Sequence, residues 1–148
     1  MITINKNEIG RAGTFLVLSD LIIHGIRAIG SDEAFPYDIV AETENKLIKI
    51  QVKSLSSRSI RGKAKTPFYN FLVKQGKIGK KYEDKDVDGF ALVMLDIKKI
   101  AYLPKNKIKG WSILLCDKEE KRLGRCNSGI SKRKFWQDYT LEKFIKSI

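Results

Sequence analysis

The hydrophobic positions near the amino terminus recur at helical spacing. Residues 5–24 carry apolar or small side chains three and four positions apart, as expected for a helix with one buried face. Asn5 or Asn7 can cap the start of this helix, and Gly25 is expected to end it after a C-terminal capping residue, His24. The predicted buried stripe consists of Ile9, Ala12, Phe15, Leu16 and Ser19.

Most of the remaining chain reads as short strands. Residues 26–29 form one short apolar run, and two more runs flank the polar residues 43–45 in the manner of a hairpin. Further strands are predicted at residues 68–73, 89–95, 99–103 and 111–116, and a terminal helix at 141–148. This order predicts an α+β protein within the broader α/β class, with a central mixed sheet flanked by helices.

Length and hydropathy bound the kind of protein. The chain has 148 residues, which favours a single domain over residues 1–148 with one hydrophobic core. No apolar run reaches the roughly 18–20 residues needed to cross a bilayer. No signal-peptide cleavage pattern follows the first apolar segment. We therefore expect a soluble, cytoplasmic protein.

The scarcity of cysteine and histidine excludes several chemistries. Cys116 and Cys126 are the only cysteines, and without an export signal they are expected to be reduced. His24 is the only histidine, so a Cys/His zinc site lacks ligands. The same count leaves Ser-His-Asp and Cys-His catalysis without a base other than His24, whose place at a helix end favours capping.

The charge distribution indicates a polyanionic partner. The formal net charge is +12, and the positive excess is concentrated. Residues 1–45 carry three Lys/Arg against seven Asp/Glu, whereas residues 46–85 carry twelve against two. Nucleic acid is the partner that such a field favours, and a solvated basic face is the alternative.

Residues 36–53 place three polar side chains on adjacent predicted strands. Asp38 lies on the first, and Gln51 and Lys53 lie two apart on the second. Because side chains alternate along a strand, Gln51 and Lys53 share a face, while Val52 points to the other. If Asp38 emerges on the same face, a carboxylate, an amide and an ammonium converge on a spot the size of one phosphate.

This combination suits phosphodiester hydrolysis. The reaction needs an activated water and neutralisation of charge, both of which a divalent cation supplies. Asp38, the amide oxygen of Gln51 and the backbone carbonyl of Val52 are hard oxygen ligands of the kind that Mg²⁺ or Mn²⁺ prefers. Lys53 can orient the water or stabilise charge in the transition state. Glu8 lies on the predicted helical stripe, so the helix is expected to aim it inward towards this metal.

Two basic segments are candidates for DNA contacts. Residues 56–67 are polar and poorly patterned, and we expect them to contact phosphates; the basic residues of this segment are Arg58, Arg61, Lys63 and Lys65. A second basic loop contains Lys77, Lys80 and Lys81 and lacks the ending of a phosphate-binding P-loop. Gly10 and Gly13 each weaken the first helix by roughly 1 kcal/mol, which close packing or approach of DNA would explain.

These residues resemble the PD-(D/E)XK nuclease superfamily, with its restriction-endonuclease-like core. The match consists of Glu8 in the first helix, residues 36–38 (Pro-Tyr-Asp) for the acidic strand and residues 51–53 (Gln-Val-Lys) for the (D/E)XK strand. One residue separates Pro36 from Asp38, and Gln51 replaces the usual carboxylate. A glutamine there resembles the group I intron homing endonucleases of cyanobacterial type, and the similarity continues through residues 87–91 and 102–104.

The resemblance implies a metal-dependent, site-specific endonuclease for double-stranded DNA, of the homing type and associated with the nucleoid when bound. Such a chain would act as a homo-oligomer, a dimer or tetramer, with one active site for each strand. Two alternatives remain open at this point. One is a Holliday-junction resolvase of the same superfamily, and the other is a non-catalytic DNA-binding domain in which Gln51 marks a decayed site.

Overall fold

The computed structural model of the protein describes residues 3–61, 66–76, 79–120 and 133–148. The larger of its two sheets has five strands in the order β1-β2-β3-β6-β7. Their bounds are β1 Arg27–Gly30, β2 Ile39–Glu42, β3 Leu47–Leu55, β6 Gly89–Met94 and β7 Lys99–Pro104. The β3–β6 pair is parallel and the other pairs are antiparallel, so this sheet is mixed.

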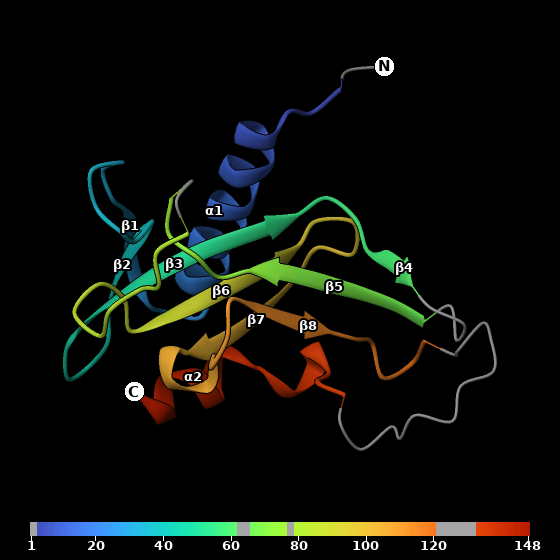
Figure 1. Cartoon of the computed structure of the whole chain (residues 1–148). Helices are drawn as coiled ribbons and strands as arrows, with labels where there is room; N and C mark the ends of the chain where they lie inside the picture. Colours follow the sequence, from blue (N-terminus) through green and yellow to red (C-terminus); the bar gives the residue numbers. More distant parts are fainter. Residues whose placement is uncertain (1–2, 62–65, 77–78, 121–132) are drawn as a thin grey trace.

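The second sheet has three antiparallel strands in the order β4-β5-β8. Their bounds are β4 Ser59–Arg61, β5 Thr66–Leu72 and β8 Ser112–Leu115. The helices are α1 Lys6–Ile23 and α2 Leu141–Ser147, with short 3-10 turns η1 Lys105–Lys107 and η3 Trp136–Asp138. Figure 1 shows both helices and the second sheet arranged around the central sheet. The α+β class with a mixed sheet flanked by helices is confirmed.

Alternation along β6 divides the hydrophobic core into two layers. All six residues of this strand are buried. Ala91 and Val93 pack with α1 and α2 on one face, whereas Phe90, Leu92 and Met94 pack with β5 and β8 on the other. A strand that is buried on both faces reads as a continuous apolar run, which is the pattern found here.

The helix α1 begins and ends where the sequence predicts. The Asn5 side chain accepts hydrogen bonds from the backbone N–H groups of Asn7 and Glu8, and Glu8 accepts one from the Asn5 backbone, which completes a capping box. His24 is the C-cap residue, and Gly25 follows with a φ of +78°. This left-handed conformation is cheap only for glycine, so Gly25 fixes the end of the helix.

The buried face of α1 differs from the predicted one. Ala12, Phe15 and Ser19 are exposed, and the buried positions are Gly13, Val17 and Leu21. The physical reason lies in the contact with β3, because a Cβ atom on Gly13 would stand 1.7 Å from the Oγ atom of Ser54 and 2.9 Å from its Cβ atom. The glycine allows α1 to approach the sheet, and the stripe that includes it becomes the buried one.

The predicted strands are present with shifts of one or two residues at their ends. The exception is residues 56–67, for which the sequence predicts no regular structure; part of this segment forms β4, paired with β5. Its three residues lack a repeating pattern long enough to be detected. Within the described ranges, no helix is long and apolar enough to cross a membrane.

Replacement of Gly13 by Ala should destabilise the protein, because the added methyl group collides with Ser54. We expect a loss of about 1–3 kcal/mol in the free energy of unfolding, measured by urea denaturation. Gly10→Ala in the same helix is the matched control, since nothing lies within 4 Å of a Cβ atom there. The control should gain roughly 1 kcal/mol from helix propensity. Equal effects of the two changes would contradict close packing at Gly13.

Candidate active site

Asp38 stands directly before β2, where the chain enters the central sheet. Its backbone N–H donates to the carbonyl of Ile50 with an N···O distance of 3.0 Å. Its carboxylate oxygen Oδ2 accepts hydrogen bonds from the backbone N–H of Val52 at 2.8 Å and from the side-chain amide Nε2 of Gln51 at 2.5 Å. Backbone and side chain together fix Asp38 against the middle of β3.

Gln51 and Lys53 lie on one face of β3, as their spacing predicts. In the parallel pair with β6, Gln51 is opposite Phe90 and Lys53 is opposite Leu92. Phe90 and Leu92 belong to the core layer beneath the second sheet, so the two polar side chains project on that same side. The hydrogen bond from Gln51 shows that the Asp38 carboxylate also reaches this side. The structure therefore brings Asp38, Gln51 and Lys53 together.

Lys53 is half-buried beside an aromatic ring. Its Nζ atom donates to the backbone carbonyl of Lys74 at 3.3 Å and lies 5.4 Å from the ring centroid of Tyr82. Burial lowers the pKa of Lys53, and the negative charge of Asp38 opposes this change. A lysine whose pKa is lowered gives up a proton more readily than an exposed one.

Asp38 is perturbed in the complementary direction. Burial raises the pKa of the Asp38 carboxyl, and the Val52 N–H bond and the charge of Lys53 act against it. Burial and the Asp38 charge also raise the pKa of Tyr82 to about 12, so this phenol stays protonated near neutral pH. Perturbed groups of opposite sign that gather in one place are typical of functional sites.

The oxygen atoms around Gln51 fit a divalent cation. The Nε2 atom of Gln51 points at two of the predicted ligands, the Asp38 carboxylate and the carbonyl of Val52, the latter at 3.2 Å. Rotation of the amide by half a turn would put its oxygen there and complete a set of three hard oxygens. Among the described residues, no group of three or more His, Cys, Asp or Glu side chains could hold a metal. A cation at Asp38 would therefore take further ligands from water and phosphate, as Mg²⁺ commonly does.

Glu8 occupies a different place from the one predicted. Its side chain is exposed, and its Oε2 atom accepts the backbone N–H of Asn5 at 2.8 Å in the capping box. The expectation that α1 aims Glu8 inward fails because the buried stripe passes through Gly13 instead. The sequence Asn-x-x-Glu was a signal for this capping role.

The predicted DNA-contacting residues that the structure describes come from two segments, around β4 and before Tyr82. Arg58 is exposed and forms an ion pair with Glu120. Lys80 pairs with Glu83 at 3.2 Å, and the Nζ atom of Lys81 lies 5.6 Å from the Trp111 ring centroid. Arg61 ends β4. Lys63, Lys65 and Lys77 lie outside the described residues. Their contacts with DNA stay predictions.

The structure has a groove along α1 that the sequence analysis did not predict. It has a volume of about 780 Å³ and runs beside Asp38. The residues that α1 contributes to this groove, here called the α1 groove, are Lys6, Asn7, Gly10, Arg11, Thr14 and Phe15. These positions recur at three-to-four spacing on the side away from Gly13 and Val17. That repeat of polar and basic residues was the signal that could have identified the groove.

The comparisons with known proteins place the chain in a family. The PD-(D/E)XK endonuclease family matches residues 4–138, and the chain belongs to it. Among solved structures, the fold is similar to that of a bacterial homing endonuclease, I-Ssp6803I. The two share 15% sequence identity with a TM-score of 0.62, over 82% of this chain and 84% of that one. No curated protein matches the chain by sequence.

Replacement of Asp38 by Asn should stabilise the fold at neutral pH. The raised pKa means that the folded chain holds the ionised carboxylate less well than the unfolded chain does. The contribution of Asp38 to stability is therefore largest at acidic pH and is lost as the pH rises through its pKa. We expect a gain of about 0.5–2 kcal/mol at pH 7, measured by urea denaturation, that closes as the pH falls.

The fully exposed Asp84 supplies the matched control. Asp84→Asn should leave the free energy of unfolding nearly unchanged across the same pH range, since exposed pairs contribute little. A loss of stability in Asp38→Asn at pH 7 would contradict the prediction. It would mean that the hydrogen bonds to the carboxylate stabilise its charged form by more than burial destabilises it.

Proposed function

We propose that this protein is a site-specific endonuclease of the homing type that hydrolyses double-stranded DNA with Mg²⁺ or Mn²⁺. One observation carries the proposal. In a chain of the PD-(D/E)XK endonuclease family, Asp38 and Gln51 are hydrogen-bonded and Lys53 lies on the same face. The structural likeness to a homing endonuclease supports the homing type within that family.

The residues present divide the work of phosphodiester hydrolysis. Asp38 and the Val52 carbonyl would hold the cation, with the amide oxygen of Gln51 as a third ligand. When bound, the cation supplies a more acidic water and charge neutralisation at the phosphate. Lys53 lies where its ammonium can position that water or stabilise charge on the phosphate. Metal ligation by Glu8 stays a prediction; in this structure its carboxylate accepts a hydrogen bond at the helix cap.

The α1 groove offers a path for the DNA backbone to Asp38. Lys6 and Arg11 supply positive charge there, and Asn7 and Thr14 supply neutral polar groups. Gly10 leaves open space on this side of the helix. No described residue packs so closely that this position must be glycine, and a DNA backbone that approaches closely would use that space.

The two strands of a duplex favour a homo-oligomer, a dimer or tetramer, with one active site for each strand. The resolvase alternative shares the catalytic residues but recognises branched DNA. Cleavage assays on a random-sequence plasmid and on a four-way junction, each with magnesium and with chelator, separate these functions. Cutting of the plasmid duplex at one sequence supports the homing type, whereas cutting of the junction alone supports a resolvase.

Removal of either charged group should stop cleavage without preventing DNA binding. We expect Asp38→Ala to abolish metal-dependent cleavage, and Lys53→Met to lower the cleavage rate by about 10²-fold or more. Binding measured by fluorescence anisotropy in the presence of Ca²⁺ should remain largely intact, because most affinity comes from phosphate contacts elsewhere.

Glu142→Ala and Lys99→Met are controls that remove the same charges at positions away from the site. Glu142 lies on α2 and Lys99 at the start of β7, and both are exposed. Both variants should cut like the wild type. Unchanged cleavage by Asp38→Ala would refute the proposed site, and a wild-type chain that binds but never cuts would support the decayed binding domain.

Replacement of Arg11 by Ala should weaken DNA binding in a salt-dependent way. A phosphate contact at this position would contribute roughly 0.9 to the slope of log affinity against log salt, and its loss should reduce the slope by that amount. Lys146→Ala on α2 is the control, with a lysine that pairs with Glu142 in its own helix. If the slope does not change in Arg11→Ala, the α1 groove does not hold the backbone.

A further inference from the structure

The strand β1 presents an open sheet edge with apolar side chains around it. It is the last strand of the five-stranded sheet, and Figure 1 shows it at the left margin of the molecule. A groove of about 720 Å³ follows this edge. Its apolar lining, here called the β1 edge patch, consists of Ile22, Ile26, Ala28, Ile29, Val40 and Leu47.

The exposure of this patch is unusual for a free surface. Ile29 is 69% exposed, Leu47 is 64% exposed and Ile22 is 58% exposed. Contiguous apolar side chains around an unpaired strand attract another chain, and free proteins normally protect such edges with charge or a covering segment. We therefore expect the β1 edge patch to be covered by a partner.

The edge strands β7 and β8 have contacts that β1 lacks among the described residues. On β7, the Tyr102 N–H donates to the carbonyl of Tyr139 at 2.9 Å. The end of β8 is continued by a bridge between Cys116 and Phe135. On β1, the backbone groups of Ala28 and Gly30 have no hydrogen-bond partner among the residues that the structure describes.

The hydrogen-bond pattern shows which backbone groups face outward. The Ser31 N–H donates to the carbonyl of Asp38 at 2.8 Å. Because hydrogen-bonded pairs alternate along an antiparallel ladder, Ile29 and Arg27 also direct their backbone groups towards β2. Ala28 and Gly30 then direct theirs towards the open edge. Two residues with free N–H and C=O groups, one on each side of Ile29, form a symmetric template.

We propose that the β1 edge binds a second copy of this chain, strand β1 against strand β1, in an antiparallel pair centred on Ile29. In this register Ala28 of each copy is opposite Gly30 of the other, and all four outward-facing groups of each strand are used. Ile29 meets Ile29 of the second copy across the two-fold axis. The apolar side chains of the patch become buried on both copies.

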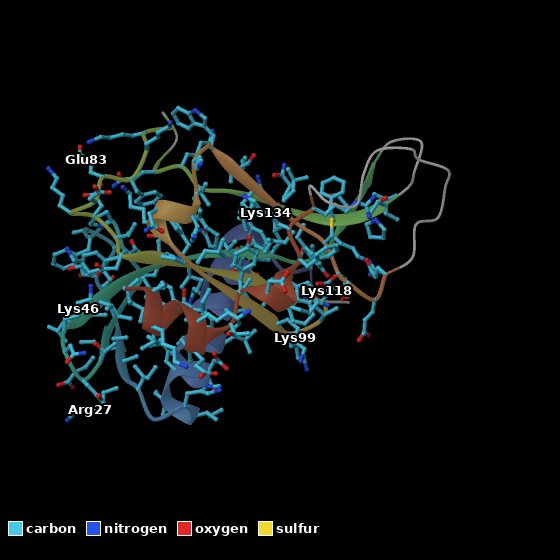
Figure 2. All side chains as sticks on the ribbon, turned by 90° about the horizontal axis from the view of Figure 1, so that it is seen from below. Arg27, Lys46, Glu83, Lys99, Lys118 and Lys134 are labelled. Carbon is cyan, nitrogen blue, oxygen red and sulfur yellow. The ribbon has the colours of Figure 1, made fainter. Side chains whose placement is uncertain are left out.

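Charge complementarity supports a second copy over other partners. Arg27 lies at one end of the strand, and Asp32 and Glu33 follow the other end. The antiparallel register puts Arg27 opposite Ser31 of the second copy and two residues from its Glu33. Arg27 is 85% exposed and pairs with Glu42 of its own chain at 2.9 Å. Figure 2 shows Arg27 at the periphery of the molecule. With an apolar lining and Glu42 beside it, this edge does not suit a phosphate backbone.

The inference rests in part on the proposed function, because cutting both strands of a duplex calls for two sites. A two-fold axis at β1 would relate two chains so that each contributes its own Asp38. The surface itself is argued from the free edge, the exposed apolar residues and the charges. Its test therefore uses neither DNA nor metal.

A cysteine at the centre of the pair tests the register directly. In a non-hydrogen-bonded antiparallel pair, opposite Cα atoms lie about 4.5 Å apart, within the range of about 4.4–6.8 Å that a disulfide spans. The variant Ile29→Cys is made with Cys116→Ser and Cys126→Ser, so that it carries a single cysteine. We expect it to form a disulfide-linked dimer on mild oxidation, seen on a non-reducing gel.

Leu114→Cys in the same background is the matched control, a comparably exposed apolar residue on β8. It should remain monomeric on the gel. The same pair of positions serves a second measurement, light scattering of the protein without DNA. Wild type and Leu114→Lys should show at least twice the 16.9 kDa of one chain, and Ile29→Lys should self-associate at least about tenfold more weakly because like charges face each other.

The outcomes separate this proposal from the nuclease proposal. A wild-type chain that is monomeric at every concentration overturns the β1 interface, and so does a dimer in which Ile29→Cys fails to cross-link. Circular dichroism shows whether Ile29→Lys is folded, and the cysteine result stands independently of that variant. A chain that dimerises through β1 but never cuts DNA would refute the nuclease and keep the interface. A monomer that cuts would do the reverse.

Discussion

The hydrogen bond from the Val52 N–H to the Asp38 carboxylate joins the site to the sheet. Asp38 stands before β2 and Val52 in the middle of β3, so this 2.8 Å contact fixes the acidic group relative to the strand that carries Gln51 and Lys53. The central sheet then fixes that strand on both sides, with β2 antiparallel and β6 parallel. The precision of the site comes from the rigid sheet beneath it.

The same arrangement lowers the stability of the folded protein. Burial disfavours the charged forms of both Asp38 and Lys53, and their mutual attraction offsets only part of that penalty. The protein retains two half-buried opposite charges where apolar residues would pack with less penalty. Active sites commonly lower the stability of the fold in this way, because their chemistry depends on groups with shifted pKa values.

The fold was largely readable from the sequence, and the reasons are local. Alternation and turn residues identify the hairpin that carries Asp38, Gln51 and Lys53, and the β6–β7 hairpin follows from the same pattern. Helix caps predicted the start and end of α1, since Asn5 and Gly25 act within a few residues. The strand β4 was missed because three residues carry too little pattern.

The failures arise where contacts distant in sequence decide. The buried stripe of α1 depends on Ser54 of β3, which no helical repeat reveals, and the misplaced stripe led to an inward-facing Glu8. The α1 groove depends on Asp38 lying next to the helix in space. The family resemblance supplied the identity of the acidic and lysine strands, whereas composition and spacing alone supplied only a phosphate-sized cluster.

The parallel pairing of β3 with β6 has a consequence for the order in which the protein folds. The strands β4 and β5 lie between β3 and β6 in the sequence. The β3–β6 pair therefore forms only after the long connection between the two strands has closed. The local hairpins can assemble sooner. We therefore expect the strand that carries Gln51 and Lys53 to gain its contacts with β6 late in folding, so the candidate site is completed only when the whole central sheet has formed.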